Sequence, residues 1–202
     1  MDIDLHPLAP GFLSPTLDAQ RTFRTILEAM AHPGRILPVC EPLQPPGPLS
    51  IGAAALCLTL LDFETSLWAD SAVTRPALDW LRFHCGCKIA AQPWAADFAL
   101  IASPGQIPSL VLFPAGEDEY PERSATLIVQ VDGLSPQGGK RLSGPGIRDF
   151  THLNAEGLPE SFWEERQSQS SLYPLGVDIL FVSGRTIAAL PRATATDNRI
   201  CM

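Results

Sequence analysis

Lysine is scarce in this 202-residue chain, because Lys88 and Lys140 are the only two among 14 basic residues. Acidic residues number 22, so the formal net charge at pH 7 is −8. Proteins that coat nucleic acid normally carry a basic stripe, and this charge balance argues against that class. Arginines can still bind a small anion locally inside an acidic protein, so that kind of site stays open.

The sequence also lacks a long apolar run. The longest strongly apolar stretch, residues 51–61, is too short to cross a bilayer. The first residues, MDIDLHPLAPG, are acidic and do not show the charged-then-apolar order of a signal peptide. The cysteines number five, an odd count that, without an export signal, favours reduced thiols. We therefore predict a cytoplasmic protein without membrane contact.

What is present suits a globular domain. Hydrophobic residues make up 46% of the chain, and its length allows a core that needs neither disulfides nor a metal to fold. The chain contains 20 prolines and 15 glycines, and these 35 residues tend to end helices and strands, which predicts short elements and many loops. We expect a single domain over residues 1–202.

Hydrophobic periodicity predicts helices and strands that alternate early, with a hairpin late in the chain. A helix over 16–31 carries an apolar stripe of Phe23, Ile26, Leu27 and Met30, and His32-Pro33-Gly34 ends it. Further helices are expected over 51–61, 74–86 and 159–169. Strands are expected over 36–39, 67–69, 98–102, 110–113, 125–131, 177–182 and 186–190. This pattern indicates an α/β fold, a layered mixed sheet flanked by helices.

The segment His84-Cys85-Gly86-Cys87, at the end of an expected helix, contains three side chains of the types that bind zinc, an imidazole and two thiols. A structural zinc site usually draws on two separated ligand pairs, and here the second would come from Cys40, Cys57, Cys201 or His32. Free cysteines and a packed or capping His84 are therefore the preferred interpretation, and a thiolate–metal module remains an alternative.

The glycine-rich stretch over 138–147 is the best candidate for an anion site. Glycines let backbone N–H groups approach a phosphate, and Lys140, Arg141 and Arg148 could neutralise it. The stretch does not match a Walker A loop, because Arg141 follows Lys140 where Ser or Thr is required. A hairpin turn followed by a kinked strand is the structural alternative.

A pyridoxal phosphate (PLP) enzyme would need a lysine for its Schiff base and usually an acid near the ring nitrogen. Lys88 or Lys140 would have to be that lysine, and Asp178 could be the acid. No surrounding motif distinguishes either lysine, so a free-standing PLP-dependent enzyme is the alternative hypothesis rather than the preferred one.

Several segments together resemble PhnH, the H-subunit family of the bacterial carbon–phosphorus lyase system for phosphonate degradation. The resemblance covers roughly residues 14–196 and rests on matching motifs in the same order. These are DAQRTFR at 18–24, MAHPG at 30–34, LRFH at 81–84, ATLIVQV at 125–131, RLSGPGI at 141–147, PLGVD at 174–178 and LPR at 190–192.

The resemblance implies a fold similar to the large domain of type I PLP-dependent transferases, without the cofactor. It also implies a homodimer that joins the G, I and J subunits in a core complex. With the G, I and L subunits, such a protein is needed to form ribose 1-methylphosphonate 5-triphosphate from ATP and methylphosphonate. The resemblance assigns no catalytic residues to the H subunit itself, and Cys85 and Cys87 are not part of the pattern.

The preferred hypothesis is therefore a mainly structural, non-autonomous subunit of a transferase complex in phosphonate catabolism. It expects no cofactor and no metal, and it allows an anion pocket for phosphonate or nucleotide oxygens. The residues we expect to form that pocket are Arg82, His84, Arg141, Gly144, Gly146 and Arg148.

Overall fold

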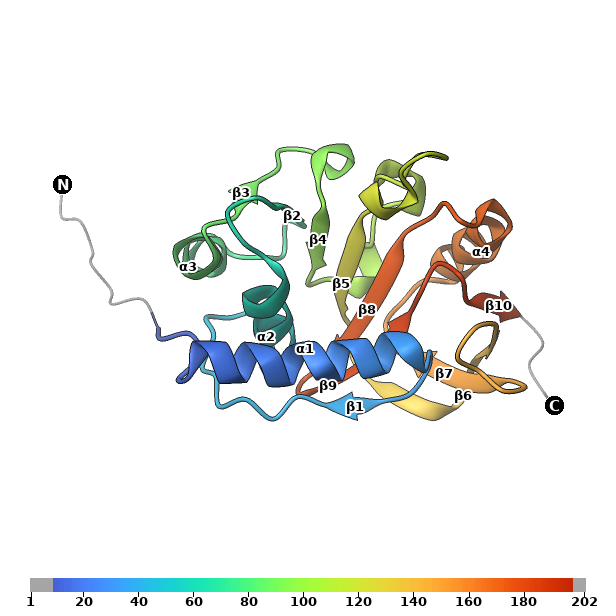
Figure 1. The fold of residues 1–202 in the computed structure, drawn as a ribbon, viewed down its shortest axis with the longest axis horizontal. Helices are drawn as coiled ribbons and strands as arrows, with labels where there is room; N and C mark the ends of the chain where they lie inside the picture. The colour runs from blue at the N-terminus through green and yellow to red at the C-terminus, as the bar shows by residue number, and fades with distance from the viewer. Residues whose placement is uncertain (1–8, 198–202) are drawn as a thin grey trace.

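A seven-stranded mixed sheet forms the middle of the molecule (Figure 1). The computed structural model describes residues 9–197 of the chain. Within that range the helices are α1 (Pro15–Ala31), α2 (Ile51–Leu60), α3 (Arg75–Cys85) and α4 (Glu160–Gln169). The strands of the large sheet are β1 (Leu37–Pro38), β2 (Ser66–Ala69), β3 (Lys88–Ile89), β4 (Phe98–Ile101), β5 (Thr126–Gln130), β8 (Asp178–Ser183) and β9 (Thr186–Leu190). Short 3-10 turns connect several of them.

The strand order is β1-β9-β8-β5-β4-β2-β3. The five strands from β3 to β8 pair in parallel, whereas β9 pairs antiparallel with β8 and with β1. The central parallel strands β4, β5 and β8 are nearly continuous apolar runs, as expected when both faces of a sheet are covered. The α/β class, the mixed sheet and its flanking helices are thus as predicted.

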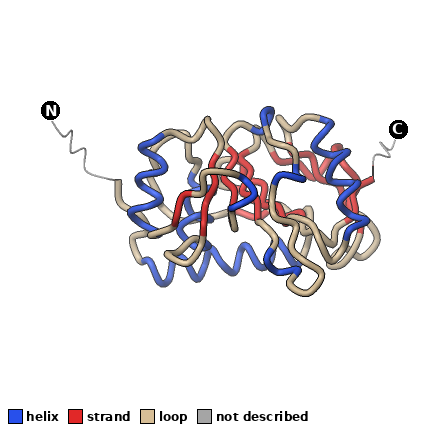
Figure 2. Tube along the Cα trace, turned by 90° about the horizontal axis from the view of Figure 1, so that it is seen from above, coloured by secondary structure: helices blue, strands red, loops and turns tan. Residues whose placement is uncertain are grey.

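Alternation along each strand divides the core into two layers. Leu100, Ile128 and Leu180 face the layer that contains α1, α2 and α3. Their neighbours Ile101, Leu127 and Phe181 face the layer that contains α4, where Phe181 contacts the rings of Phe162 and Trp163. Figure 2 shows helices on both sides of the central strands.

A second, three-stranded antiparallel sheet extends one end of the molecule. It consists of β6 (Leu134–Ser143), β7 (Thr151–Ala155) and β10 (Ala195–Asp197), in the order β10-β6-β7. The register of β6 on β7 shifts between Ser135 and Lys140, where Gly138 and Gly139 have positive φ angles. The expected order, a hairpin turn followed by a kinked strand, is thus reversed: the irregular strand β6 runs through these glycines and the turn comes after Ser143. The strands β7 and β10 carried no clear alternating pattern and were not predicted.

Two sequence expectations are wrong. Residues 110–113 were expected as a strand, but Leu110–Leu112 form a 3-10 turn, η3, whose Leu110 is buried against the sheet. The apolar stripe of α1 is also not all core: Ile26 is buried, but Phe23 and Leu27 are 45% and 51% exposed. The buried face of α1 instead includes the polar Asp18 and Thr22.

The end of α1 carries a small cluster of charges, in which Glu28 pairs with Arg35 and His32. Within residues 9–197, no helix has both the length and the apolar character that crossing a membrane requires.

Candidate functional site

The strongest candidate site is a cavity of about 500 Å³ between the end of α1 and the turn that follows β6. Two of the segments that carry the family resemblance meet here, the His-Pro-Gly turn after α1 and the Gly-Pro-Gly turn after β6. The cavity is lined by His32, Pro33, Gly34, Arg35, Ile36, Pro136, Gly146, Ile147, Arg148, Phe150 and Thr151.

Two glycines allow these turns to interlock. Gly34 and Gly146 both have φ near +81°, in the left-handed region that favours glycine. A Cβ atom at Gly146 would lie 2.1 Å from the carbonyl oxygen of Ala31. A Cβ atom at Gly34 would lie 2.9 Å from Thr151 Cγ2. Any larger residue would therefore push the two turns apart and deform the cavity.

The cavity carries a positive balance of charge. The Arg35 Nη1 atom lies 2.5 Å from Glu28 Oε1, and His32 Nδ1 lies 3.4 Å from the same oxygen. Arg148 is exposed and makes no ion pair with another residue of the described chain. The lining thus contains two arginines and a histidine and no carboxylate, and the guanidinium of Arg148 is available for charge-assisted hydrogen bonds to an anion.

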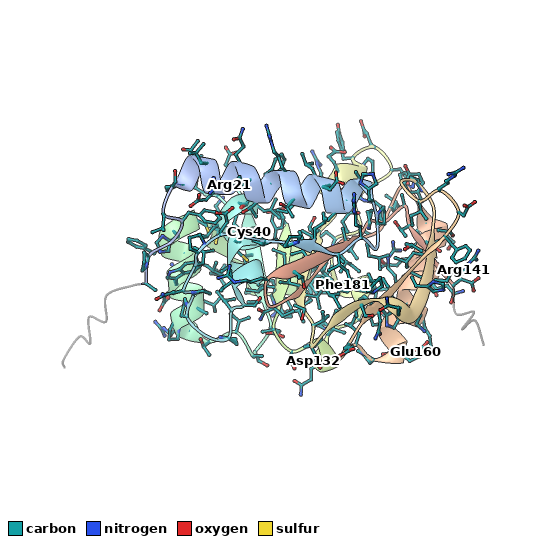
Figure 3. The ribbon with its side chains drawn as sticks, turned by 90° about the horizontal axis from the view of Figure 1, so that it is seen from below. Arg21, Cys40, Asp132, Arg141, Glu160 and Phe181 are labelled. Carbon is teal, nitrogen blue, oxygen red and sulfur yellow. The ribbon has the colours of Figure 1, made fainter. Side chains whose placement is uncertain are left out.

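The remaining predicted residues near this turn have other roles. Arg141 lies 4.6 Å above the ring of Phe150, which lines the cavity, and its Nη1 atom is 3.7 Å from Asp197 Oδ2. Figure 3 shows Arg141 at the same end of the molecule as Glu160. Gly144 holds the turn against residue 193, since a Cβ atom there would lie 2.9 Å from the Ala193 carbonyl oxygen. Gly146 and Arg148 line the cavity itself.

The structure does not bring Arg82 and His84 to this site. Both belong to α3, which lies at the opposite end of the molecule from β6 and β7 (Figure 1). His84 Nε2 hydrogen-bonds the carbonyl oxygen of Ala9 at 3.0 Å, and Trp80 Nε1 donates to the same oxygen at 2.6 Å. His84 therefore anchors the segment before α1. This agrees with the preferred interpretation of His84 as a packed side chain.

Cys57, Cys85 and Cys87 form a buried or partly buried group rather than a reactive one, whereas Cys40 is exposed. Burial is the main cause that raises the pKa values of Cys57, Cys85 and Cys87, that of Cys85 to about 12. Cys85 Sγ donates to the carbonyl oxygen of Cys57 at 3.6 Å. Within residues 9–197 no three His, Cys, Asp or Glu side chains could jointly hold a metal ion, and Cys201 lies outside that range.

The two lysines lie in unrelated places. Lys88 is exposed on the edge strand β3. Lys140 is in β6, where its Nζ atom lies 2.5 Å from Glu160 Oε1 and 5.9 Å from the ring centre of Trp163. Asp178 begins β8 and binds Arg192 at 2.7 Å. No pair of these residues therefore presents the lysine and the acid of a PLP site together.

Lys140 lines a second cavity, of about 710 Å³, that adjoins the first at Pro136. Glu156 and Glu160 also line it, so its carboxylates outnumber its single lysine. The glycine-rich stretch predicted as one anion site is thus divided, and its acidic part around Gly138 is the less suitable half for an anion.

The place where open α/β sheets usually bind ligands is occupied by a side chain of the protein. The chain runs from β2 outward to β3 and then back across to β4, and ligands commonly bind at the carboxyl ends beside such a switch point. Here Asp70 Oδ2 accepts the amides of Ala102 and Ser103 at 3.0 and 2.9 Å. Its Oδ1 atom accepts those of Ala72 and Val73, both at 3.2 Å.

Sequence reasoning missed the contribution of α1 to the site. His32 was treated as part of a helix stop and Arg35 was not considered, yet both line the cavity with Arg148. A sequence signal existed, because both motifs contain glycines that need left-handed backbone and both adjoin an arginine. Periodicity could not show that the two turns touch, since they are far apart in the chain.

The fold and the cavity together define an α/β protein whose candidate anion site lies between the end of α1 and an accessory sheet, rather than at the switch point of its main sheet. Comparison with known families then gives a direct match: residues 10–197 match PhnH, described as a bacterial phosphonate metabolism protein. The chain belongs to the PhnH family.

Two relatives agree with this assignment. The chain is 32% identical over 187 residues to the alpha-D-ribose 1-methylphosphonate 5-triphosphate synthase subunit PhnH of Rhizobium meliloti (strain 1021), covering 91% of this chain and 92% of that protein. It is 30% identical over 175 residues to a candidate C-P lyase subunit protein, HtxG, of Stutzerimonas stutzeri, covering 87% and 84% of the two chains.

Proposed function

We propose that this protein is a subunit of the complex that forms ribose 1-methylphosphonate 5-triphosphate from ATP and methylphosphonate, and that it does not act alone. The observation that carries the proposal is the similarity to the Rhizobium meliloti synthase subunit along nearly the whole of both chains. The motif resemblance adds the expected partners: the G, I and J subunits of the core complex, with the L subunit acting in the same reaction, and a second copy of this chain.

Within that complex, the cavity at the two glycine turns is where this subunit would contact a phosphonate or nucleotide anion. Arg148 and Arg35 supply the charge, and the open glycine turns leave backbone close to the cavity. This assignment keeps Gly146 and Arg148 from the predicted set, adds His32 and Arg35, and leaves Arg82 and His84 out.

The proposal also includes the likeness to the large domain of type I PLP-dependent transferases. The seven-stranded sheet with a parallel centre supports it. The occupied switch point at Asp70 supports a protein that has this architecture without using its usual ligand crevice. A single domain that works in the cytoplasm completes the proposal.

Co-expression of the tagged chain with the G, I and J subunits tests the assembly. We expect all four proteins to co-purify and to elute as one species in size-exclusion chromatography. A chain that purifies without any of the three would contradict the proposal.

The anion site is tested in the assembled complex by titration with ATP and with methylphosphonate. Replacing Arg35 and Arg148 with alanine should weaken binding of one of them about tenfold or more, because two charge-assisted hydrogen-bond donors are lost. Arg75→Ala is the matched control, since Arg75 is 90% exposed at the start of α3, far from the cavity. Unchanged affinity in the double variant would remove the anion role and leave the assembly role intact.

A further inference from the structure

An apolar groove of about 460 Å³ runs between α4 and the η3 turn, on the layer of the molecule away from α1. One wall is a single face of α4 that continues into the following turn, because its residues recur at helical spacing. The other wall is Val111 of η3. The lining side chains that the argument uses are Val111, Ser161, Glu164, Glu165, Ser168 and Leu172. The two serines are small and leave the face of α4 hollow.

The two walls are held at a defined separation. Glu165 Oε2 accepts hydrogen bonds from Ser109 Oγ at 2.9 Å and from the amide of Leu110 at 2.6 Å. Leu110 itself is 1% exposed, packed under the turn. The groove is therefore pre-formed, and binding there would not incur the entropic cost of ordering its walls.

Large apolar side chains are exposed at this groove although the core lies directly beneath it. Val111 is 76% exposed and Leu172 is 52% exposed, and both line the groove. The adjoining Leu112 and Tyr173 are also exposed. Single exposed apolar residues are ordinary, but a gathered set of them around a concave surface is typical of an interaction site.

The charge of the groove is of one sign. Glu164 and Glu165 line it, and no lysine, arginine or histidine does. The one arginine of α4, Arg166, points the other way, and its Nη2 atom donates to the carbonyl oxygens of Pro191 and Thr194 at 2.6 and 3.0 Å. A protein that covers this surface must therefore complement carboxylate as well as aliphatic groups.

We infer that this groove is the docking site for a basic, apolar segment of another subunit of the complex, with an aliphatic or aromatic side chain between Val111 and Leu172 and a lysine or arginine on Glu164. The inference rests on the proposed function, because it supplies a surface for the assembly that function requires. A central apolar anchor with a charged partner at its edge is the usual anatomy of such interfaces.

A second copy of this chain fits the groove less well. A two-fold symmetric contact would place the acidic groove against itself, and like charges facing each other oppose association. A contact between the groove and a different surface of a second copy would be heterologous, and would build a ring or an open chain rather than a two-fold dimer. A different protein with a basic segment meets neither difficulty.

The inference is tested with the full chain co-expressed with the G, I and J subunits. Val111→Asp and Leu172→Asp each place a carboxylate in the apolar part, and Glu164→Lys reverses the charge. Because all three positions are exposed, we expect each variant to keep the wild-type midpoint of urea unfolding within experimental error. We expect each to lower the affinity for at least one subunit about tenfold or more. Glu119→Lys, at another exposed acidic position, is the matched control and should bind normally.

The outcomes separate this inference from the proposed function. Wild-type protein that co-purifies with the other subunits, together with groove variants that do so equally well, would overturn the groove inference and leave the subunit assignment standing. Wild-type protein that binds none of them would overturn both. Groove variants that convert a wild-type dimer of this chain alone into monomers, measured by light scattering, would assign the groove to a second copy and contradict the proposed occupant.

Discussion

The carboxyl edge of the parallel strands and the β6–β7 hairpin are two places where this protein could bind a ligand, and they are built in opposite ways. At the sheet edge, Asp70 accepts four backbone amides and closes the crevice. At the hairpin, Gly34 and Gly146 allow two turns to interlock around a cavity whose arginines are exposed. Of the two places, the accessory sheet rather than the edge of the main sheet therefore carries the candidate anion site.

The same comparison explains why Asp70 and Arg148 differ in their partners. Polar groups at the sheet edge are paired with the backbone, as burial requires. At the hairpin, Arg148 keeps its charge in contact with solvent and retains its capacity to bind a ligand. Stability should therefore depend on the sheet edge and on the glycine contact that forms the cavity, and binding should depend on the arginines.

The largest expected effect is at the glycine contact. Gly146→Ala should lower the free energy of unfolding by about 3 kcal/mol or more, because it combines a left-handed backbone with a steric overlap on the Ala31 carbonyl. Urea unfolding followed by circular dichroism measures it. Gly138→Ala is the matched control, since Gly138 also has a positive φ but open space around it, and its cost should be about 1 kcal/mol. Equal costs would show that the two turns do not interlock.

The next effect is at the closed sheet edge. Asp70→Ala should lower the free energy of unfolding by about 2–3 kcal/mol, because amides lose a charged acceptor. Asp79→Ala, whose carboxylate is half exposed and makes a loose ion pair with Arg75, should cost less than about 0.5 kcal/mol. If Asp70→Ala is as mild as Asp79→Ala, the crevice is not closed by this residue and the comparison fails.

A smaller effect on the free energy of unfolding should appear when the pH is raised, because the thiols in and after α2 and α3 then lose their protons. Burial raises the pKa values of Cys57, Cys85 and Cys87 in the folded protein, that of Cys85 from 9.0 to about 12. Above about pH 9 the unfolded chain loses these protons and the folded chain keeps them, so stability is full below that pH and falls as pH rises toward 12. Between pH 8 and 10.5 we expect a loss of about 1–2 kcal/mol from Cys85.

Cys85→Ala should flatten this pH dependence, whereas replacing the exposed Cys40 with alanine should leave it as in the wild type. Urea midpoints at the two pH values provide the measurement. A pH dependence that is the same in Cys85→Ala and in the wild type would show that the thiol does not titrate as its burial requires.

The smallest effect on stability is expected at the hairpin arginine. Arg148→Ala should change the free energy of unfolding by less than about 0.5 kcal/mol, since the side chain is exposed and unpaired within the described residues. It should nevertheless weaken anion binding by the assembled complex, measured by calorimetry with ATP and with methylphosphonate. A large loss of stability would instead show that Arg148 has a structural role, like Asp70 at the sheet edge.

The sequence by itself determined the α/β class, α1 to α4 to within one or two residues, and the β8–β9 hairpin. These depend on local patterns: apolar periodicity, the residue before a proline, and Gly86 in the left-handed conformation after α3. Periodicity did not show which residues of an apolar stripe would be covered. Two of the four residues of the α1 stripe, Phe23 and Leu27, are exposed, because the elements that pack against a helix decide which of its side chains are buried.

Tertiary structure alone decided the site. It separated Arg82 and His84 from the other predicted residues by placing α3 at the far end of the molecule. It added His32 and Arg35, because the contact between Gly146 and Ala31 joins turns that are distant in the chain. Residue types and spacing along a chain indicate which chemistry is available. Which groups share one cavity depends on long-range packing, and no local pattern encodes that.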